Sequence, residues 1–261
     1  MNVDELIAKM ERHCAEVLGE HGGRNMAALA RHSHRIAAAG DRPTGRCRLG
    51  GAALLDPGTP WPEADGIPLS LLAVLDVDAL APWLGDQLRT SPGLLNFFHI
   101  QPYVDYEQYE GINPFSDARS WRVIAADPEK AVETPAPTPA YVFGQLPAQA
   151  DPVITLPGHE ESVVGSLDLG PGNEHRIPVV EAADIHTTWP PGTDGYAHGH
   201  RAFGWPYPQQ GNLTGKDEIL LLQLSGGGGF EWGDGGLMYY LIPAEALHAG
   251  DFSQVRVQRG E

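Results

Sequence analysis

The sequence is poor in cysteine. Only Cys14 and Cys47 occur among its 261 residues, and they are far apart in the chain. Two isolated cysteines exclude a disulfide framework and also a zinc site built from thiolate ligands. Free thiols are typical of proteins that work in a reducing compartment, so we expect a cytoplasmic location.

Long apolar runs are also missing. No stretch approaches the about 18 consecutive apolar residues that a membrane-spanning helix needs. The first residues, MNVDELIAKMERH, mix charged and apolar side chains and lack the apolar core of a secretory signal. We therefore expect a protein that neither spans a membrane nor is secreted.

Basic residues are scarce. Seventeen Lys and Arg stand against 34 Asp and Glu, which gives a net charge of −17. Residues 1–48 carry 8 basic and 6 acidic side chains, whereas residues 49–261 carry 9 and 28. Such a surface repels the phosphate backbone of nucleic acids, which proteins bind through Lys and Arg. It suits a basic protein partner, and the alternative is acidic charge that serves only solubility.

What the sequence does contain is one pattern that occurs twice. Each copy has a Gly and Trp-Pro turn, then an apolar run, then an aromatic-rich run that begins with glycine. The first copy lies in residues 49–100 and reads LGG, WP, PLSLLAVL and GLLNFFHI. The second lies in residues 203–242 and reads FGWPYP, EILLLQL and GLMYYLI. Internal similarity of this kind predicts two related sheet units in one body.

These segments, with WGDGG at residues 232–236 and HRAFGWPYPQQGN at residues 200–212, resemble the YwqG-like proteins, a bacterial family of unassigned function. The resemblance extends from Leu49 to the C-terminus and includes the helical N-terminal lead. Some relatives of that family are associated with bacterial toxin gene neighbourhoods. The resemblance therefore implies an immunity-type role or another role that depends on a protein partner.

Apolar periodicity predicts the helices and strands. Val3 to Leu18 has the spacing of an amphipathic helix that ends at residues 21–23, and a second helix at 26–39 would leave His32 and His34 solvated. Further helices are expected at 77–88 and 243–248. Apolar runs predict strands at 69–75, 93–100, 121–125, 219–224 and 237–242, with weaker ones at 141–143 and 163–169.

Together these elements predict an α+β fold. We expect a sheet-dominated single domain of two imperfect pseudo-repeats, with the N-terminal helices packed on it. Residues 1–48 form the helical lead, and residues 49–261 form the YwqG-like domain, with repeat halves at approximately 49–125 and 200–261. Between the halves, residues 127–200 are rich in proline and glycine and indicate a loop-rich insert, a place where binding residues often lie.

One group of residues has the composition of a metal site. His198 and His200 are spaced so that a strand would place both imidazoles on one side, and Asp234 would complete a set of three ligands. Asp234 also lies between two glycines. The alternative is therefore a tight turn in which its carboxylate accepts backbone N–H bonds.

Aromatic and polar side chains in turns are the remaining candidates for ligand binding. The full candidate set is His200, Trp205, Gln210, Trp232, Asp234, Tyr103 and Tyr106. Exposed aromatic residues contribute strongly to interfaces, although a tryptophan beside Pro or Gly can instead fix a turn onto the core. The glycine-rich stretch at 225–230 lacks the Lys-Ser/Thr of a phosphate loop and predicts a hairpin connection.

Two functions from different classes fit this sequence. The first is a non-enzymatic cytosolic binding protein without a cofactor, whose partner is a basic protein and whose role includes toxin immunity. The second is a small-molecule-binding protein or a metal-assisted hydrolase with a site near His198, His200 and Asp234. The sequence has no Gly-x-Ser-x-Gly motif, so serine nucleophilic catalysis is unsupported.

Overall fold

The structure is a computed structural model of the whole chain. It describes residues 3–89, 91–100, 111–172, 199–207, 213–215, 217–226 and 236–260, together with single residues at 180, 185, 189, 211, 229, 230 and 232. No helix within this part of the chain is both long and apolar enough to cross a membrane.

Ten strands form one antiparallel sheet, and two short ribbons, β3–β9 and β4–β5, accompany it. Its order is β14-β13-β12-β11-β1-β10-β2-β6-β7-β8. The strands are β1 (Arg31–Ala38), β2 (Arg48–Leu49), β3 (Ala53–Leu55), β4 (Glu63–Ala64), β5 (Ile67–Pro68), β6 (Ser70–Asp76), β7 (Leu94–His99), β8 (Trp121–Ala126), β9 (Val132–Thr134), β10 (Leu146–Thr155), β11 (His200–Ala202), β12 (Glu218–Ser225), β13 (Leu237–Pro243) and β14 (Arg256–Gly260).

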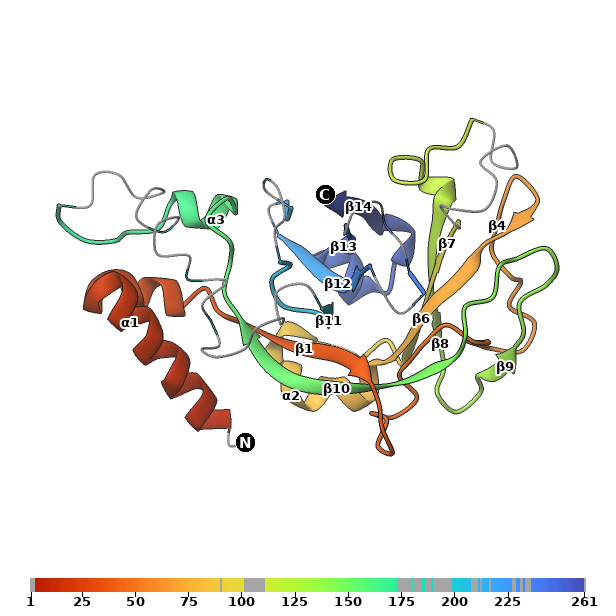
Figure 1. Ribbon diagram of the computed structural model, residues 1–261, viewed down its shortest axis with the longest axis horizontal. Coiled ribbons are helices and arrows are strands. Elements are labelled where there is room, and N and C mark those ends of the chain that lie inside the picture. The colour runs from red at the N-terminus through yellow and green to blue at the C-terminus, as the bar shows by residue number, and fades with distance from the viewer. Residues whose placement is uncertain are drawn as a thin grey trace.

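The helices lie around this sheet (Figure 1). Helix α1 stands at one end with α3, and the two share an apolar cluster with the end of β10. Helix α2 packs beneath β1, where the Trp83 indole donates 2.8 Å to the carbonyl of Ser33. The helices are α1 (Val3–Ala27), α2 (Val77–Leu84), α3 (Ser162–Gly165) and α6 (Ala244–Ala249), with single 3-10 turns η1 (Gly85–Gln87), η3 (Ala118–Ser120) and η4 (Phe252–Gln254).

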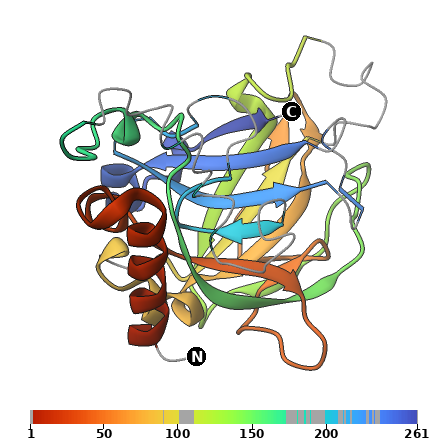
Figure 2. The same ribbon diagram turned by 60° about the vertical axis from the view of Figure 1, so that its left-hand side comes forward.

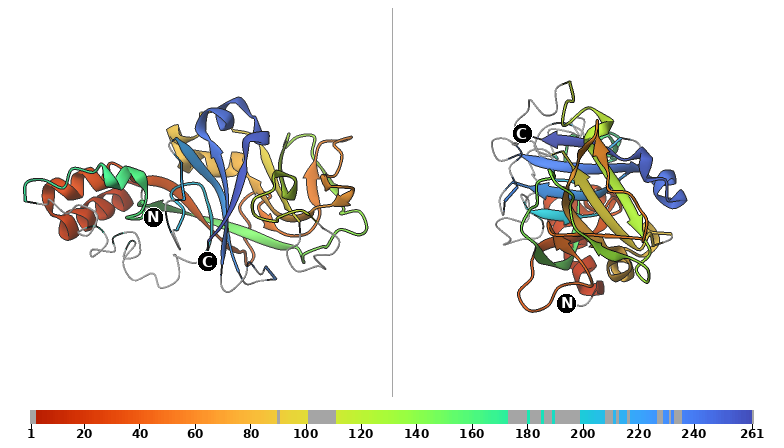
Figure 3. Two further views of the ribbon diagram at one scale, coloured as in Figure 1. Left: turned by 90° about the horizontal axis from the view of Figure 1, so that it is seen from above. Right: turned by 90° about the vertical axis from the view of Figure 1, so that its right-hand side faces the viewer.

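The sheet curls until its two edge strands, β8 and β14, approach each other (Figure 2 and Figure 3). The main apolar core fills the inside of this curl. There Phe97 of β7 and Tyr240 of β13 meet edge to face with ring centres 5.2 Å apart, and the Tyr240 hydroxyl donates 3.1 Å to the carbonyl of Phe98. One shared interior therefore holds both sides of the sheet together.

The two sides of the central β1–β10 pair carry the same order of features. Each has a short strand, β2 or β11, then a long antiparallel pair, β6–β7 or β12–β13, then an edge strand. Both long pairs contain a bulge, with Leu72 as the extra residue in β6 and Leu221 in β12. A bulge bends a strand and increases its twist, which helps a sheet to curl.

The chain also leaves β2 and β11 in the same backbone conformation. Gly50 and Gly51 have φ angles of +61° and +80°, and Phe203 and Gly204 have +59° and +74°. At Gly204 a β-carbon would stand 2.6 Å from that of Ser33, so both the dihedral angle and the space require glycine.

The predicted strands of the two copies are confirmed as antiparallel pairs. The predicted ranges 69–75 and 93–100 overlap β6 and β7, and the predicted ranges 219–224 and 237–242 lie within β12 and β13. The glycine-rich stretch is the predicted hairpin connection, because the N–H of Gly226 donates 3.1 Å to the carbonyl of Gly236.

The helix predicted at 26–39 is wrong. Residues 31–38 form β1, which pairs with β10 on one edge and β11 on the other. Its alanine-rich sequence favours a helix locally, but pairing on both edges overrides that preference. His32 stacks on Trp83 and His34 is buried, so neither is a solvated helix residue. This strand belongs to the main sheet and not to a helical lead.

The N-terminal helix does not end at residues 21–23 as predicted. It continues to Ala27 and is kinked at Gly19, whose φ of +75° is not helical. Gly23 packs against the part of the helix before this kink so closely that a β-carbon would lie 2.5 Å from the α-carbon of Ala15. The paired glycines therefore allow close packing and do not stop the helix.

The stretch 127–200 is less loop-rich than predicted, because it contributes β10 to the centre of the sheet. Only Leu146 and Pro147 of β10 pair with β2, so Pro152 has a neighbour on one side alone, a position that tolerates proline. The weak strands predicted at 141–143 and 163–169 do not form. The first lies in an irregular lead to β10, where the Phe143 carbonyl accepts the N–H of Gly51 at 3.0 Å, and the second overlaps α3.

Candidate functional site

An aromatic layer lies at the end of the sheet where β7 and β12 finish. We define it as seven rings in successive contact. Ring centres are 4.9 Å apart in two of these contacts, and 5.5 to 6.3 Å apart in the others. In order along the layer the rings are Tyr141, Phe143, Phe230 with His200 beside it, Trp232, His99 and Phe115.

The layer joins both sides of the sheet. His99 ends β7 on one side, whereas Phe230 and Trp232 come from the hairpin between β12 and β13 on the other. Phe143 enters from the lead to β10 and tilts against Phe230. Segments that are far apart in the sequence therefore assemble one continuous set of rings.

His200 is fixed in orientation by the backbone of β12. Its Nδ1 accepts the N–H of Ser225 at 3.1 Å, so in the neutral ring the proton lies on Nε2. Burial lowers the pKa of His200 to about 4, and the imidazole is therefore neutral at pH 7. It presents an N–H donor, and it can donate to a ligand but does not carry charge.

His99 is held between two backbone carbonyls. Its Nδ1 lies 2.5 Å from the oxygen of Ile100 and its Nε2 lies 2.8 Å from that of Pro114. Burial lowers its pKa to about 4, although the two carbonyls oppose this shift. The neutral ring has a single N–H, which can serve one carbonyl at a time. His99 thus anchors the segment that contains Pro114.

Trp232 contributes the least satisfied polar group of the layer. The side chain is 1% exposed, and its indole Nε1 is buried with no hydrogen-bond partner among the described residues. A buried N–H without an acceptor costs about 1–3 kcal/mol. An acceptor atom brought by a ligand or by a water molecule would remove that cost.

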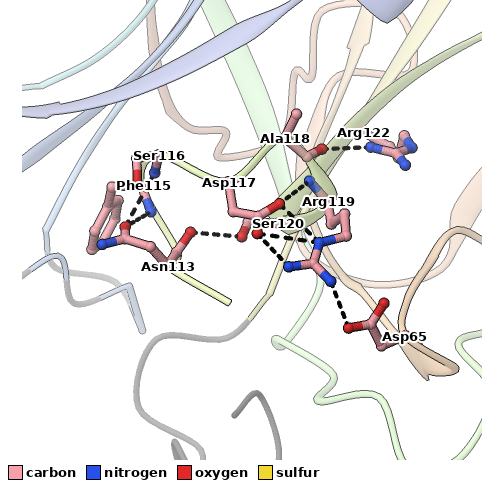
Figure 4. A network of polar contacts seen from close by, with 9 residues as sticks. All are labelled: Asp65, Asn113, Phe115, Ser116, Asp117, Ala118, Arg119, Ser120 and Arg122. Atoms are coloured by element: carbon pink, nitrogen blue, oxygen red, sulfur yellow. Dashed lines mark hydrogen bonds and ion pairs between the residues drawn. The ribbon is translucent and has the colours of Figure 1, made fainter. Parts of the chain in front are cut away.

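Phe115 closes the far end of the layer from a short loop held by polar contacts (Figure 4). The Asn113 side-chain oxygen accepts the N–H of Phe115 at 2.9 Å and that of Ser116 at 3.1 Å, and its carbonyl accepts the Ser120 hydroxyl at 3.0 Å. The Arg259 guanidinium covers the outer face of Phe115, 4.6 Å from the ring centre. These contacts fix the ring against His99.

A second set of contacts in the same loop is ionic (Figure 4). Arg119 binds the Asp117 carboxylate through two nitrogens and reaches Asp65 at 2.7 Å. The hydrogen bond from the Arg119 side chain is the main cause that lowers the pKa of Asp117 to about 2. Arg119 and Asp65 are exposed and Asp117 is partly exposed, so these contacts order the loop surface more than they stabilise the fold.

The near end of the layer reaches the surface. Tyr141 is 46% exposed, Val142 57% and Leu146 42%. Half of the six exposed large hydrophobic residues in the described chain lie in this segment, which we call the apolar rim, residues 141–146. Exposed apolar side chains that cluster in this way mark interaction sites more often than single ones do.

The structure brings together two of the candidate residues predicted from the sequence. His200 and Trp232 both contact Phe230 within the aromatic layer. Trp205 is buried elsewhere: its indole donates 2.6 Å to the carbonyl of Leu29 and lies under the Arg31 guanidinium. It fixes a turn onto the core. The other predicted residues lie outside the described residues: Tyr103, Tyr106, His198, Gln210 and Asp234.

The metal site predicted from His198, His200 and Asp234 therefore stays a prediction, because only His200 is described. Within the described ranges no three His, Cys, Asp or Glu side chains are grouped closely enough to hold a metal ion. The turn role of Asp234 is equally untested.

Several residues of the layer were not singled out from the sequence, namely Phe143, Phe230 and His99. Phe143 and Phe230 lie beside a glycine and His99 lies beside Ile100, so each resembles an ordinary core residue in the sequence. The available signal was that the second copy places Phe230 and Trp232 in its glycine-rich connection, a position where a plain hairpin needs no aromatic residue.

In the comparison with known families, the family described as Domain of unknown function (DUF1963) matches residues 47–259. The chain belongs to this family. Comparison with curated proteins gives no match. The matched range includes every strand of the sheet except β1 and the last residue of β14.

Proposed function

We propose that this protein is a non-enzymatic binding protein that recognises a basic protein partner through the aromatic layer and its apolar rim. One observation carries the proposal: a continuous set of rings extends from the buried Trp232 indole to the exposed Tyr141 side chain. Aromatic residues that are rigidly held and partly exposed are typical anchors of protein interfaces.

Charge supports a basic partner. Residues 49–261 hold 28 acidic and 9 basic side chains, so a cationic surface is attracted to this domain from a distance. The two histidines of the layer favour a binding role over catalysis, because burial keeps both neutral and each is bonded to backbone atoms. A toxin-immunity role and a cytoplasmic location are parts of this proposal. Cys14 and Cys47, both free and buried, are consistent with that compartment.

The test is a pull-down with the full-length protein as bait, followed by identification of retained proteins by mass spectrometry. We expect a partner with net positive charge that is lost when Tyr141→Glu and Val142→Glu are combined. Val3→Glu combined with Val17→Glu, which places the same two charges on exposed valines of α1, is the control and retains the partner. Both variants change exposed side chains, so their melting temperatures serve as the check on folding.

Two results would contradict this function. A partner that binds the Tyr141→Glu and Val142→Glu variant as well as the unmodified protein does not use the apolar rim. A partner that binds equally at low and high salt does not depend on the acidic surface, because exposed charges are screened over about 8 Å at physiological ionic strength.

We also propose that the two sides of the sheet arose by duplication and that the chain is YwqG-like within its family. Three features support the duplication: the matched strand order, the matched bulges, and the matched positive φ angles after β2 and β11. A fourth is an arginine at one position in each short strand, buried at Arg48 and half-buried at Arg201. Arg48 and Arg201 each donate to the carbonyl four residues further on, at Ala52 and Trp205.

A further inference from the structure

The seam of the curled sheet brings two open strand edges together. β8 and β14 are the two ends of the strand order, so among the described residues each has a neighbouring strand on one side alone. They approach closely enough for the Trp121 indole to donate 2.8 Å to the carbonyl of Val255. Within the described residues no backbone hydrogen bond joins the two strands. The sheet therefore stops just short of closing.

A cavity of about 420 Å³ lies at this seam, and none of its lining residues belongs to the aromatic layer. Its inner wall is apolar, because Trp121, Val123 and Val255 are buried side chains and Phe252 is half-buried. Arg122 also lines the cavity, but its side chain is exposed. Successive residues of a strand point to opposite faces, so β8 offers apolar side chains inward and a guanidinium outward.

Arg122 lies at the seam and has no carboxylate partner among the described residues. Its Nη1 donates 2.7 Å to the carbonyls of Ala118 and Trp121, and no carboxylate of the described chain pairs with it. Arg256 lies on β14, opposite β13, at the position that corresponds to Arg122 on β8. Unlike Arg122, it binds Glu218 through two nitrogens at 2.8 and 2.6 Å. Nearby Arg119 is bound by two aspartates. Of these three arginines, Arg122 is the one with guanidinium donors left for an incoming carboxylate.

We propose that the seam is a strand-acceptor site for an extended segment of a partner protein that carries an acidic residue between two apolar residues. The backbone of this segment pairs with the open edge of β8, in the manner of strand addition to a sheet. Its two apolar side chains point into the cavity against Trp121 and Phe252. Its carboxylate, on the opposite face, binds Arg122. A planar guanidinium pairs with a carboxylate through two parallel hydrogen bonds, which makes the acidic position selective.

The test selects short peptides from a random phage-displayed library on immobilised full-length protein. We expect an enriched pattern of apolar, acidic and apolar residues. A fluorescein-labelled peptide of that pattern should bind Arg122→Glu at least about tenfold more weakly than the unmodified protein, since a charge-assisted hydrogen bond is worth about 1.5–3 kcal/mol. Arg42→Glu, an equal change of charge at an exposed arginine outside the cavity, should leave binding unchanged.

A second measurement tests the strand pairing itself. Amide hydrogen exchange of the complex should slow at residues 122–126 of β8, and replacing the acidic residue of the peptide with glutamine should weaken binding. Selected peptides that bind Arg122→Glu as tightly as the unmodified protein would overturn the carboxylate contact. No enriched pattern, or slowed exchange confined to residues outside β8 and β14, would overturn the acceptor site.

Discussion

The two sides of the sheet agree on the inside and differ on the outside. Their inner faces meet in one core, where Phe97 and Tyr240 touch. The outer face of β6 and β7 is covered by the two short ribbons and by Trp61, whereas that of β12 and β13 carries a smaller cluster around Tyr239. A helix connects β6 to β7, but a glycine-rich hairpin connects β12 to β13. The strand ladder and the inner face therefore define this fold. The connections between strands and the residues that cover the outer face can vary, and they can acquire a function.

The aromatic layer is built partly from such a variable connection. Phe230 and Trp232 lie in the hairpin of the second side, at the place in the chain order that α2 occupies on the first side. The same comparison distinguishes the two edge strands, because Arg256 has a carboxylate partner and Arg122 has none. Each proposed binding site lies at a point where the two sides differ.

Replacing the tryptophan of each turn is expected to have the largest effect. Trp205 is 3% exposed and its indole is hydrogen-bonded, so Trp205→Ala should lower the free energy of unfolding by about 3–5 kcal/mol. Trp61 is only half-buried, and Trp61→Ala should cost less. Urea unfolding of both variants measures the difference. Equal losses would mean that the two turns are equally packed.

Acid should destabilise the protein through histidines on both sides of the sheet. Burial lowers the pKa of His99 and of His200 to about 4, below the about 6.5 of an unfolded chain. Their contribution is present above pH 6.5 and is lost as the pH falls toward 4, because the unfolded state then binds more protons. The shift corresponds to about 3 kcal/mol for each ring.

Urea midpoints between pH 7 and pH 4 test this dependence. His200→Gln should flatten the fall in stability, since glutamine does not titrate in this range. Val17→Gln, which places the same side chain at an exposed position of α1, is the control. An unchanged profile for His200→Gln would show that His200 titrates normally.

Replacing the paired glycines with alanine should destabilise the two sides of the sheet unequally. This difference in stability should be smaller than the one between the two tryptophan variants. Gly51 and Gly204 both have positive φ angles, so either change costs about 1–2 kcal/mol in backbone strain. At Gly51 the new methyl meets the exposed side chain of Gln145, which can move away. At Gly204 it meets the buried Ser33, which cannot. The melting temperature of Gly204→Ala should therefore be lower than that of Gly51→Ala. The opposite order would contradict this account of the two turns.

Removing the exposed ion pairs should have the smallest effects on stability. Arg119→Gln removes contacts that are largely in solvent, so we expect no measurable change in melting temperature. Arg256→Gln leaves the half-buried Glu218 without its partner and should give a measurable loss. Adding salt should reduce that loss, and a larger effect for Arg119→Gln would reverse the expected order.

Much of the strand ladder was predictable from the sequence, because buried strands such as 69–75 and 219–224 are continuous apolar runs between turn residues. β1 and β10 were not. Their apolar residues alternate with His, Arg, Gln and Asp, and their pairing with each other cannot be inferred from either segment alone. Residues 31–38 also contain alanines, which favour helix when considered without partners.

The candidate site was predictable in part. Glycine and proline neighbours drew attention to His200 and Trp232, and the structure places both against Phe230. Phe143 could not be found in this way, because an aromatic side chain has no sequence feature that distinguishes a core position from an interface. The curl of the sheet creates the layer, and curl is a property of the whole ladder.

The central position of β1 has a consequence for how the chain folds. Arg31 pairs with Thr155 and His34 pairs with Ala202, so the first strand to be synthesised must wait for partners that emerge much later. Closing such long loops is entropically costly and slows folding relative to local pairing. Until then, β1 is an unpaired edge on a nascent chain, exposed to the kind of association that chaperones prevent. The strand that unites the finished sheet is thus the one at greatest risk while the sheet is being made.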